Sequence, residues 1–264
     1  MASSDHTGDH HGSGSFPADP MHQFEIVELV EFKLFDLNLS FTNSSLFMVF
    51  SVALIIFLTL FTFNGRGTVP TRLQSIAELS YEFVGKMVRD NVGDEGQKYF
   101  PFIFCLFMFV LFCNMLGMIP YTFTVTSHII VTFALAIVIF FGVTVIGFVM
   151  HGINFLKFFV PSGVPKALLP LLVVIEVISY LTRPVSLSVR LFANMMAGHT
   201  MLKVFGFFVA GMFFSGNLLI APLGVAPLLF ITAFTGLEIL VAFLQAYVFA
   251  ILTCIYLNDA IHMH

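Results

Sequence analysis

The sequence predicts an all-α polytopic membrane protein with about five transmembrane helices and one further amphipathic helix at the membrane interface. Hydrophobic residues make up 58% of the 264-residue chain and charged residues only 10%, whereas soluble domains carry about 25% charged residues. Several apolar runs approach the roughly 20 residues that a helix needs to cross a bilayer. The last two apolar runs are much longer, which predicts two long, strongly tilted helices that form a near-horizontal hairpin.

Residues 1–22 are polar and rich in His, Gly, Ser and Asp, which predicts a disordered tail. They lack the basic start and apolar core of a secretory signal peptide. Weak metal binding by the tail histidines is the alternative to a plain solvated tail; these are His6, His10 and His11. Residues 24–40 mix acidic and apolar residues and are expected at the membrane surface. Residues 23–264 as a whole are expected to form a single membrane domain.

The first predicted span, at about 46–63, carries no charge and is long enough to cross. Residues 71–98 differ from it, because apolar residues recur there at helical spacing among charged ones. This pattern predicts an amphipathic helix in the membrane interface, with packing on a soluble partner as the alternative. The apolar positions are Leu73, Ile76, Leu79, Phe83, Met87 and Val88.

Four more spans follow in the sequence. Two of ordinary length are predicted at about 100–119 and 127–150. The next apolar segment, about 167–208, is interrupted by several charged residues, and the last, about 225–257, carries one carboxylate. Both are too long for one perpendicular crossing, so tilted helices are the simplest explanation.

The distribution of basic residues predicts the topology. The segments 64–98 and 151–166 contain Lys and Arg residues, whereas the loops at 120–126 and 209–217 contain none. Basic loops favour the cytoplasmic side. Five alternating spans therefore place the N-terminus outside and the C-terminus in the cytoplasm.

Two predicted helices each carry a polar line. Glu176, Arg183 and Arg190 are spaced by seven residues and Asn194 follows one turn later, so all four fall within about 40° on a helix. His199 lies nine residues after Arg190, which places it on the far side. In the last helix the members of the polar line are Glu238, Gln245 and Tyr256.

These polar lines favour a functional interpretation. A charged side chain at bilayer depth costs about 2.5–3.5 kcal/mol on insertion scales and normally faces a partner or a water-filled cavity. The alternative is interhelical polar packing, which membrane bundles also use. So many ionisable groups together are instead typical of proton relays, because Glu and His take up and release protons near working pH.

Arg190 is not expected to act as a relay, because a guanidinium does not deprotonate in proteins. A fixed cation repels a travelling proton and attracts a carboxylate. Arg190 should therefore block a direct leak while favouring the ionised form of a mobile acid. No second mobile acid is evident in this chain, which predicts a partner that supplies one.

At these residues the chain resembles the a subunit of F-type ATP synthases, the proton-channel subunit. The resemblance covers nearly the whole chain beyond the first twenty residues or so, and the arginine motif is highly specific. The segments that carry it are RPVSLSVRLFANMMAGH at 183–199, GLEILVAFLQAYVFAILTCIYLNDAI at 236–261, PMHQFEI near the start, and NMLGMIPYTFTVTSH at 114–128.

The resemblance implies a mechanism and assigns the site residues. Protons would enter by one aqueous half-channel, ride on the carboxylates of a c-subunit ring and leave by another, with Arg190 as the essential fixed cation. Asn194 and Gln245 match polar residues near that arginine, and Glu176 matches a carboxylate of the family. The remaining candidates for the proton pathway are His199 and Glu238, with Arg183, Tyr256 and Asn114 as secondary ones.

The pair His199 and Glu238 also implies a lineage. Some bacterial members have glutamate in the arginine helix and histidine in the last helix, whereas here the two residues are exchanged. This arrangement is similar to that of mitochondrial members and implies an alphaproteobacterial or mitochondrial source. The expected location is the bacterial inner membrane, with the mitochondrial inner membrane as the alternative.

The implied partners are the c-subunit ring, b-type peripheral stalk subunits and lipid. No cofactor, metal or catalytic residue is predicted, and the absence of a GxxxxGK[ST] motif argues against a nucleotide site. The net charge of −4 and the lack of basic clusters argue against nucleic acid. The cysteines are expected to be apolar filler rather than a disulfide framework; they are Cys105, Cys113 and Cys254.

Two other classes of function remain as alternatives. A self-contained proton-coupled secondary transporter is disfavoured, because no internal repeat is visible and over-long tilted helices suit a curved partner better than a closed pocket. A haem or quinone carrier is expected to place paired histidines within its spans. Only His199 lies well inside one.

Overall fold

The structure is a computed structural model in which long helices dominate the described part of the chain. It describes residues 28–30, 33–34, 37–38, 40–63, 71–119, 122–160, 168–214 and 221–262. Five of the described helices are long and apolar enough to cross a membrane. The tail predicted at 1–22 lies outside the described residues.

The helices follow the predicted order, and most boundaries agree within a few residues. The α-helices are α1 (Asn43–Phe63), α2 (Arg72–Val92), α3 (Phe100–Gly117), α4 (Ile129–His151), α5 (Leu169–Phe213) and α6 (Val225–Ile261). Short 3₁₀ helices join them: η2 (Asp94–Tyr99), η3 (Val125–Ser127), η4 (Gly152–Phe159) and η5 (Ala221–Gly224). The spans predicted at 167–208 and 225–257 both end too early, since α5 and α6 each continue for about one further turn.

The all-α prediction is incomplete near the N-terminus, where four short strands precede α1. β1 (Glu28–Val30) pairs antiparallel with β4 (Phe41–Thr42), and between them β2 (Lys33–Leu34) pairs with β3 (Leu37–Asn38). Polar and apolar residues alternate over much of this segment, and alternation with a period of two favours strands over helices.

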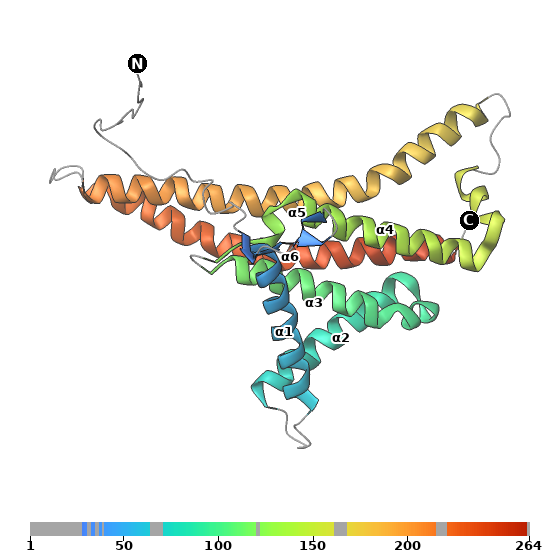
Figure 1. Ribbon diagram of the computed structural model, residues 1–264, viewed down its shortest axis with the longest axis horizontal. Coiled ribbons are helices and arrows are strands. Elements are labelled where there is room, and N and C mark those ends of the chain that lie inside the picture. The colour runs from blue at the N-terminus through green and yellow to red at the C-terminus, as the bar shows by residue number, and fades with distance from the viewer. Residues whose placement is uncertain are drawn as a thin grey trace, which may run out of the picture.

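The two longest helices determine the shape of the molecule. α5 and α6 run antiparallel along the long axis, and α1 crosses their direction steeply (Figure 1). This is the predicted long hairpin. The first part of α5, yellow in Figure 1, is angled away from the rest of that helix. Pro184 lies inside α5, where its missing N–H and its ring favour a bend.

The core forms around α6, which packs against α2, α3, α4 and α5. On its inner face a row of small residues is fully buried at four-residue spacing: Ala242, Ala246, Ala250 and Cys254. Small residues at this spacing allow another helix to approach closely within a membrane. The adjacent face of α3 fills the interface with the buried side chains Ile103, Phe107, Val110 and Asn114.

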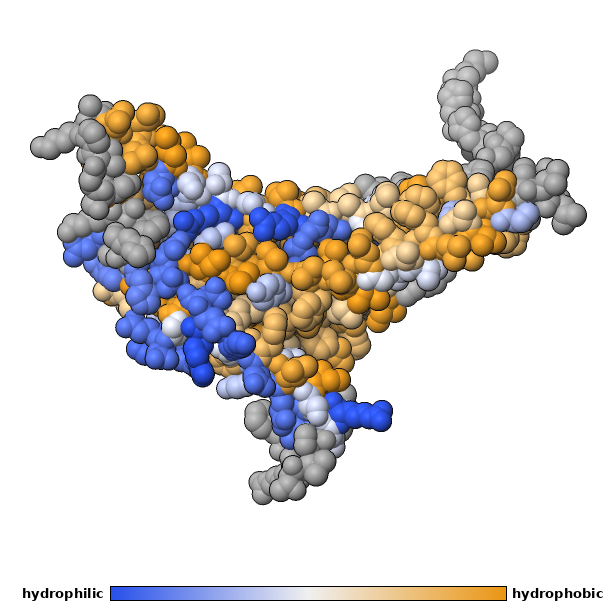
Figure 2. Space-filling view, turned by 180° about the vertical axis from the view of Figure 1, so that it is seen from behind, coloured by the Kyte–Doolittle hydropathy of each residue, from blue (hydrophilic) through white to orange (hydrophobic). Residues whose placement is uncertain are grey.

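The outer surface is largely apolar, as contact with lipid requires. Large hydrophobic side chains such as Phe57 on α1 and Phe141 on α4 are more than half exposed. In Figure 2 the arm in which the end of α5 meets the start of α6 is mostly orange and tan, while hydrophilic residues gather at the other end. An exposed apolar surface of this extent marks a contact with membrane or protein rather than with water.

The interfacial helix predicted at 71–98 is shorter than expected, and its buried face is different. Gly93 ends α2 with a φ of 79° and a ψ of −163°. Of the predicted apolar face, Met87 and Val88 are buried, but Ile76 and Leu79 remain 55% and 68% exposed. The buried face also contains Ala77, Val84 and Val92. α2 therefore has two apolar sides, one against the core and one facing outward, which suits a position at the membrane surface.

Gly93 provides a test of this boundary. Its backbone conformation is one that essentially only glycine adopts, and an added Cβ would meet nothing within 4 Å. Gly93→Ala should therefore destabilise the protein through backbone strain alone, by on the order of 1–3 kcal/mol. Gly85→Ala inside α2 is the matched control and should be neutral or slightly stabilising. Equal unfolding free energies for the two variants, measured by denaturant titration in mixed micelles, would contradict this account of Gly93.

Candidate functional site

A buried acid–base pair joins the two long helices. Glu238 of α6 has a side chain that is only 3% exposed, and His199 of α5 is 11% exposed. The His199 Nδ1 atom lies 3.6 Å from the Glu238 Oε1 atom. His199 is therefore on the inner side of α5, as its nine-residue spacing from Arg190 predicts.

Gly198 lets the carboxylate come this close to α5. A Cβ atom added at Gly198 would lie 2.5 Å from Glu238 Oε1 and 2.9 Å from Glu238 Cδ. Any larger residue would thus displace the carboxylate. Both oxygens of Glu238 are buried and make no hydrogen bond to another described residue, so His199 is the nearest group that can share a proton with them.

Thr124 is the third member of this cluster, and sequence reasoning did not identify it. It lies in the connector between α3 and α4, of which residues 118–119 and 122–128 are described. Its Oγ1 atom lies 3.2 Å from His199 Nε2. Thr124 falls within the motif at 114–128, but nothing in that uncharged loop distinguishes it from its neighbours.

Arg190 lies on the opposite side of α5 and is exposed. No described residue forms a hydrogen bond or ion pair with its guanidinium group. Asn194, one turn further on, is also exposed, and the surrounding positions Ser186, Ala193 and Ala197 are small and exposed. The guanidinium group is thus accessible to a partner that packs on this side of α5.

Arg183 has a different environment, although it shares the predicted line with Arg190. Its Nη1 atom donates a hydrogen bond of 2.9 Å to Asp259 Oδ2 on α6. Its guanidinium carbon also lies 5.4 Å from the Tyr180 ring centroid and 5.0 Å from that of Tyr256. The Tyr180 hydroxyl in turn lies 2.7 Å from the Thr144 hydroxyl of α4. Arg183 therefore joins α5 to α6, and its neighbour Tyr180 joins α5 to α4.

Asp259 was also missed by sequence reasoning. The last span was predicted to end at 257, with a short polar tail beyond it. Because α6 continues to Ile261, Asp259 is on the helix and faces α5. The other end of the predicted line, Glu176, is half-buried on α5, and no described residue pairs with its carboxylate.

Gln245 of α6 and Asn114 of α3 lie along the inner side of α6, one to two turns from Glu238. Gln245 is buried, two turns after Glu238. Asn114 of α3 is fully buried, and its Nδ2 atom donates a hydrogen bond of 3.2 Å to the Ala242 carbonyl oxygen. Ala242 lies one turn from Glu238, so Asn114 contacts α6 between Glu238 and Gln245.

Within the described parts of the chain, no three His, Cys, Asp or Glu side chains are placed to hold a metal ion. His128 ends the connector with its ring stacked on Phe123 at 4.9 Å, and burial lowers its pKa.

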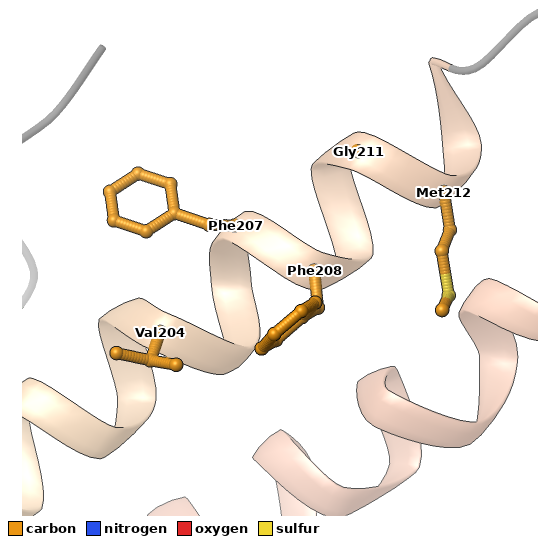
Figure 3. Close-up of a pocket in the computed structure, with 5 residues that line it drawn as sticks. All are labelled: Val204, Phe207, Phe208, Gly211 and Met212. Carbon is orange, nitrogen blue, oxygen red and sulfur yellow. The ribbon is translucent and has the colours of Figure 1, made fainter. Parts of the chain in front are cut away.

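A cavity of about 450 Å³ lies beyond His199 near the end of α5 (Figure 3). Its lining is entirely apolar: Val204, Phe207, Phe208, Gly211 and Met212. Phe208 and Met212 point toward the neighbouring helix, whereas Phe207 points away from it. Without a polar group, this cavity has no means to bind or transfer a proton.

Comparison with known proteins identifies close relatives over almost the full length. A sequence profile for the ATP synthase A chain matches residues 45–258. ATP synthase subunit a of Pelagibacter ubique is 62% identical over 247 residues, which is 93% of this chain and 98% of the relative. ATP synthase subunit a of Parvibaculum lavamentivorans is 58% identical over 257 residues, covering 97% and 98% of the two chains. That of a Chelativorans species is 59% identical over 246 residues, covering 92% and 98%.

The link through Arg183 leads to a testable prediction. Asp259→Asn and Arg183→Gln should each destabilise the protein. In a double-mutant cycle the pair should show a coupling of about 1 kcal/mol, because the ion pair is partly sheltered and the guanidinium also contacts two rings. The measurement is unfolding in mixed micelles. Arg89→Gln with Asp90→Asn, exposed neighbours on α2 that form no described ion pair, is the matched control and should be additive. Additive effects at Arg183 and Asp259 would show that the contact does not stabilise the protein.

Proposed function

The chain belongs to the ATP synthase A chain family, and from this premise we propose how its residues translocate protons as the stator subunit of an F-type ATP synthase. It is a multi-pass membrane protein that works with other subunits of the membrane sector. In the proposed mechanism, two aqueous half-channels deliver protons to the carboxylates of a c-subunit ring and collect them again. Proton flow is thereby coupled to ring rotation.

The observation that carries the proposal is the division of α5 into two sides. Arg190 is exposed on one side, whereas His199 on the other side is only 11% exposed and faces the buried Glu238 of α6. A charged guanidinium in a membrane helix requires a partner or water, and no described residue of this chain supplies an ion pair. A ring carboxylate that passes along the exposed side would supply it.

Polar groups lie on both sides of Arg190 along the helix axis, which is what two separate half-channels need. Glu176 is fourteen residues before Arg190, or about 21 Å along a helix, and Arg183 with Asp259 lies in the same direction. His199 and Glu238 lie in the other direction, and Asn114 donates a hydrogen bond to the Ala242 carbonyl, one turn from Glu238. We assign one half-channel to each group and leave Arg190 between them.

The fixed charge explains why protons would take the rotor rather than a direct path. Arg190 repels a proton that moves straight between the half-channels and holds an arriving ring carboxylate in its ionised form. A proton that crosses by way of the ring yields about 2.3 kcal/mol per 100 mV of membrane potential. A self-contained transporter is less well supported, because its charged site would be enclosed rather than exposed on the surface.

Several features support a C-terminus on the cytoplasmic side. The basic segment formed by α2 and η2 packs against α6. The end of α4, which precedes the basic segment at 151–166, meets the end of α6, where His151 Nε2 lies 3.0 Å from the Ile261 carbonyl oxygen. Among the described residues, η2 thus contacts α6 and His151 contacts its C-terminal end, and basic loops favour the cytoplasm. The N-terminus would then be outside.

The remaining assignments follow from the family. We place the chain in a bacterial inner membrane, with b-type stalk subunits and lipid as its other neighbours. We treat residues 23–264 as one membrane domain.

Arg190→Ala tests the central residue of this proposal. In the complete complex in proteoliposomes, ATP-driven proton pumping should fall to background, because nothing then holds the ring carboxylate ionised. Passive proton conduction through the membrane sector should remain. Arg72→Ala, which removes an exposed arginine from α2, is the control and should pump normally. Unchanged coupled pumping in Arg190→Ala would rule out the assignment.

Glu238→Gln tests the buried side of α5. Loss of one positioned acid–base group commonly lowers a proton-transfer rate by about 10²–10⁴, so proton flux should fall by at least tenfold while the complex still assembles. Glu78→Gln on the exposed face of α2 is the matched control. Normal flux in Glu238→Gln, measured with a pH-sensitive dye, would remove Glu238 from the pathway.

A further inference from the structure

Thr124, His199 and Glu238 form a linear chain of contacts from three separate elements. The Thr124 hydroxyl contacts His199 Nε2 at 3.2 Å, and His199 Nδ1 faces Glu238 Oε1 at 3.6 Å. The two ring nitrogens of His199 thus have different partners. Which of them carries the proton decides how the pair with Glu238 works.

The Thr124 hydroxyl has one proton, and its position next to Gly117 determines where that proton points. Thr124 Oγ1 donates a hydrogen bond of 3.3 Å to the Gly117 carbonyl oxygen at the end of α3. The last carbonyls of a helix have no partner within the helix. Those of Asn114, Met115 and Leu116 accept hydrogen bonds from residues 118–122. Among the described donors, the Thr124 hydroxyl is the one that reaches Gly117.

The direction of this hydrogen bond determines the tautomer of His199. Because the hydroxyl donates to Gly117, its oxygen faces His199 as an acceptor, and Nε2 must carry a hydrogen. In the neutral ring Nδ1 then has a lone pair directed at Glu238. A deprotonated carboxylate that faces the Nδ1 lone pair in a buried site is unfavourable, because two acceptors then face each other without a proton. The pair is therefore stable when one proton lies between Nδ1 and Oε1.

Two glycines make room for this arrangement. A Cβ atom on Gly117 would lie 2.7 Å from Thr124 Cγ2, and one on Gly198 would lie 2.5 Å from Glu238 Oε1. By contrast, Gly206 of α5 and Gly236 of α6 have nothing within 4 Å of an added Cβ. Each end of the chain of contacts thus packs closely against a glycine.

We propose that Thr124 is a positioning residue that fixes His199 in the tautomer protonated at Nε2, so that His199 and Glu238 share a single proton between Nδ1 and Oε1. This role rests on the proton pathway proposed above. Transfer within the pair breaks the Glu238 O–H bond and forms an Nδ1–H bond. The products are a carboxylate and an imidazolium, so the net charge of the pair does not change.

Other charged or titratable groups lie near His199. Lys203 is one turn further along α5, Glu238 faces the ring from α6, and His128 ends the connector that carries Thr124. Arg190 lies on the opposite side of α5. Among the described residues, Thr124 Oγ1 is the group at hydrogen-bond distance from His199 Nε2, and Lys203 and Arg190 have no lone pair that could accept its hydrogen.

The tautomer is measured directly by ¹⁵N NMR of the complete complex labelled at histidine, with His199 assigned by difference from a His199→Gln complex. We expect a neutral ring with hydrogen on Nε2, or an imidazolium that loses the Nδ1 proton first. A neutral ring with hydrogen on Nδ1 would overturn the proposal. That result would leave the proposed function intact, because the function is tested separately by Arg190→Ala.

The positioning role is tested by proton flux in proteoliposomes. Thr124→Val keeps the shape but removes the acceptor, so flux should fall about tenfold, equivalent to about 1.4 kcal/mol. Half-maximal flux should move to lower pH, because the imidazolium loses a hydrogen-bond acceptor. Thr124→Ser should restore both properties. Thr126→Val is the matched control in the same connector, since the Thr126 hydroxyl has no partner among the described residues. Equal losses in Thr124→Val and Thr126→Val, or an unshifted pH profile in Thr124→Val, would overturn the role.

Discussion

Arg190 carries a charge that proteins do not neutralise by deprotonation, and it lies on an exposed side of α5 whose neighbouring side chains are mostly small and uncharged. A permanent charge at an exposed position of a membrane helix limits what can pack against that helix. The charge must meet an anion or water, and no described residue of this chain forms an ion pair with it. The contrast with Arg183 is informative, because that guanidinium is held by Asp259 and two aromatic rings. One arginine thus stabilises the fold, and the other remains available to a partner.

On the opposite side of α5, His199 faces an acid that is buried in the interior of the protein. The Glu238 carboxylate has no hydrogen-bond partner among the described residues, and His199 Nδ1 lies 3.6 Å from it. A neutral pair that shares one proton avoids a buried net charge. The row of small residues on α6 brings α3 close on this side. Because this packing is close, water and protons would reach polar groups at only a few positions along these helices.

Much of this arrangement could be predicted from the sequence, because it depends on helical periodicity. The five spans, the long hairpin and the opposite orientations of Arg190 and His199 all follow from spacing. Gly93 and the strands near the N-terminus could not be predicted as easily, since they depend on local backbone conformation in a mixed segment. Thr124 and Asp259 were missed for another reason. Their roles arise from contacts across more than seventy residues of sequence, which periodicity does not reveal.

The most direct test of the central claim is a high-resolution cryo-EM map of the assembled complex with its ring. The account predicts that the Arg190 guanidinium lies within roughly 4–6 Å of a ring carboxylate, a distance at which an opposite charge favours the ionised form. His199 and Glu238 should remain on the far side of α5. A guanidinium turned toward lipid headgroups, or paired with an acid of its own chain, would contradict the account.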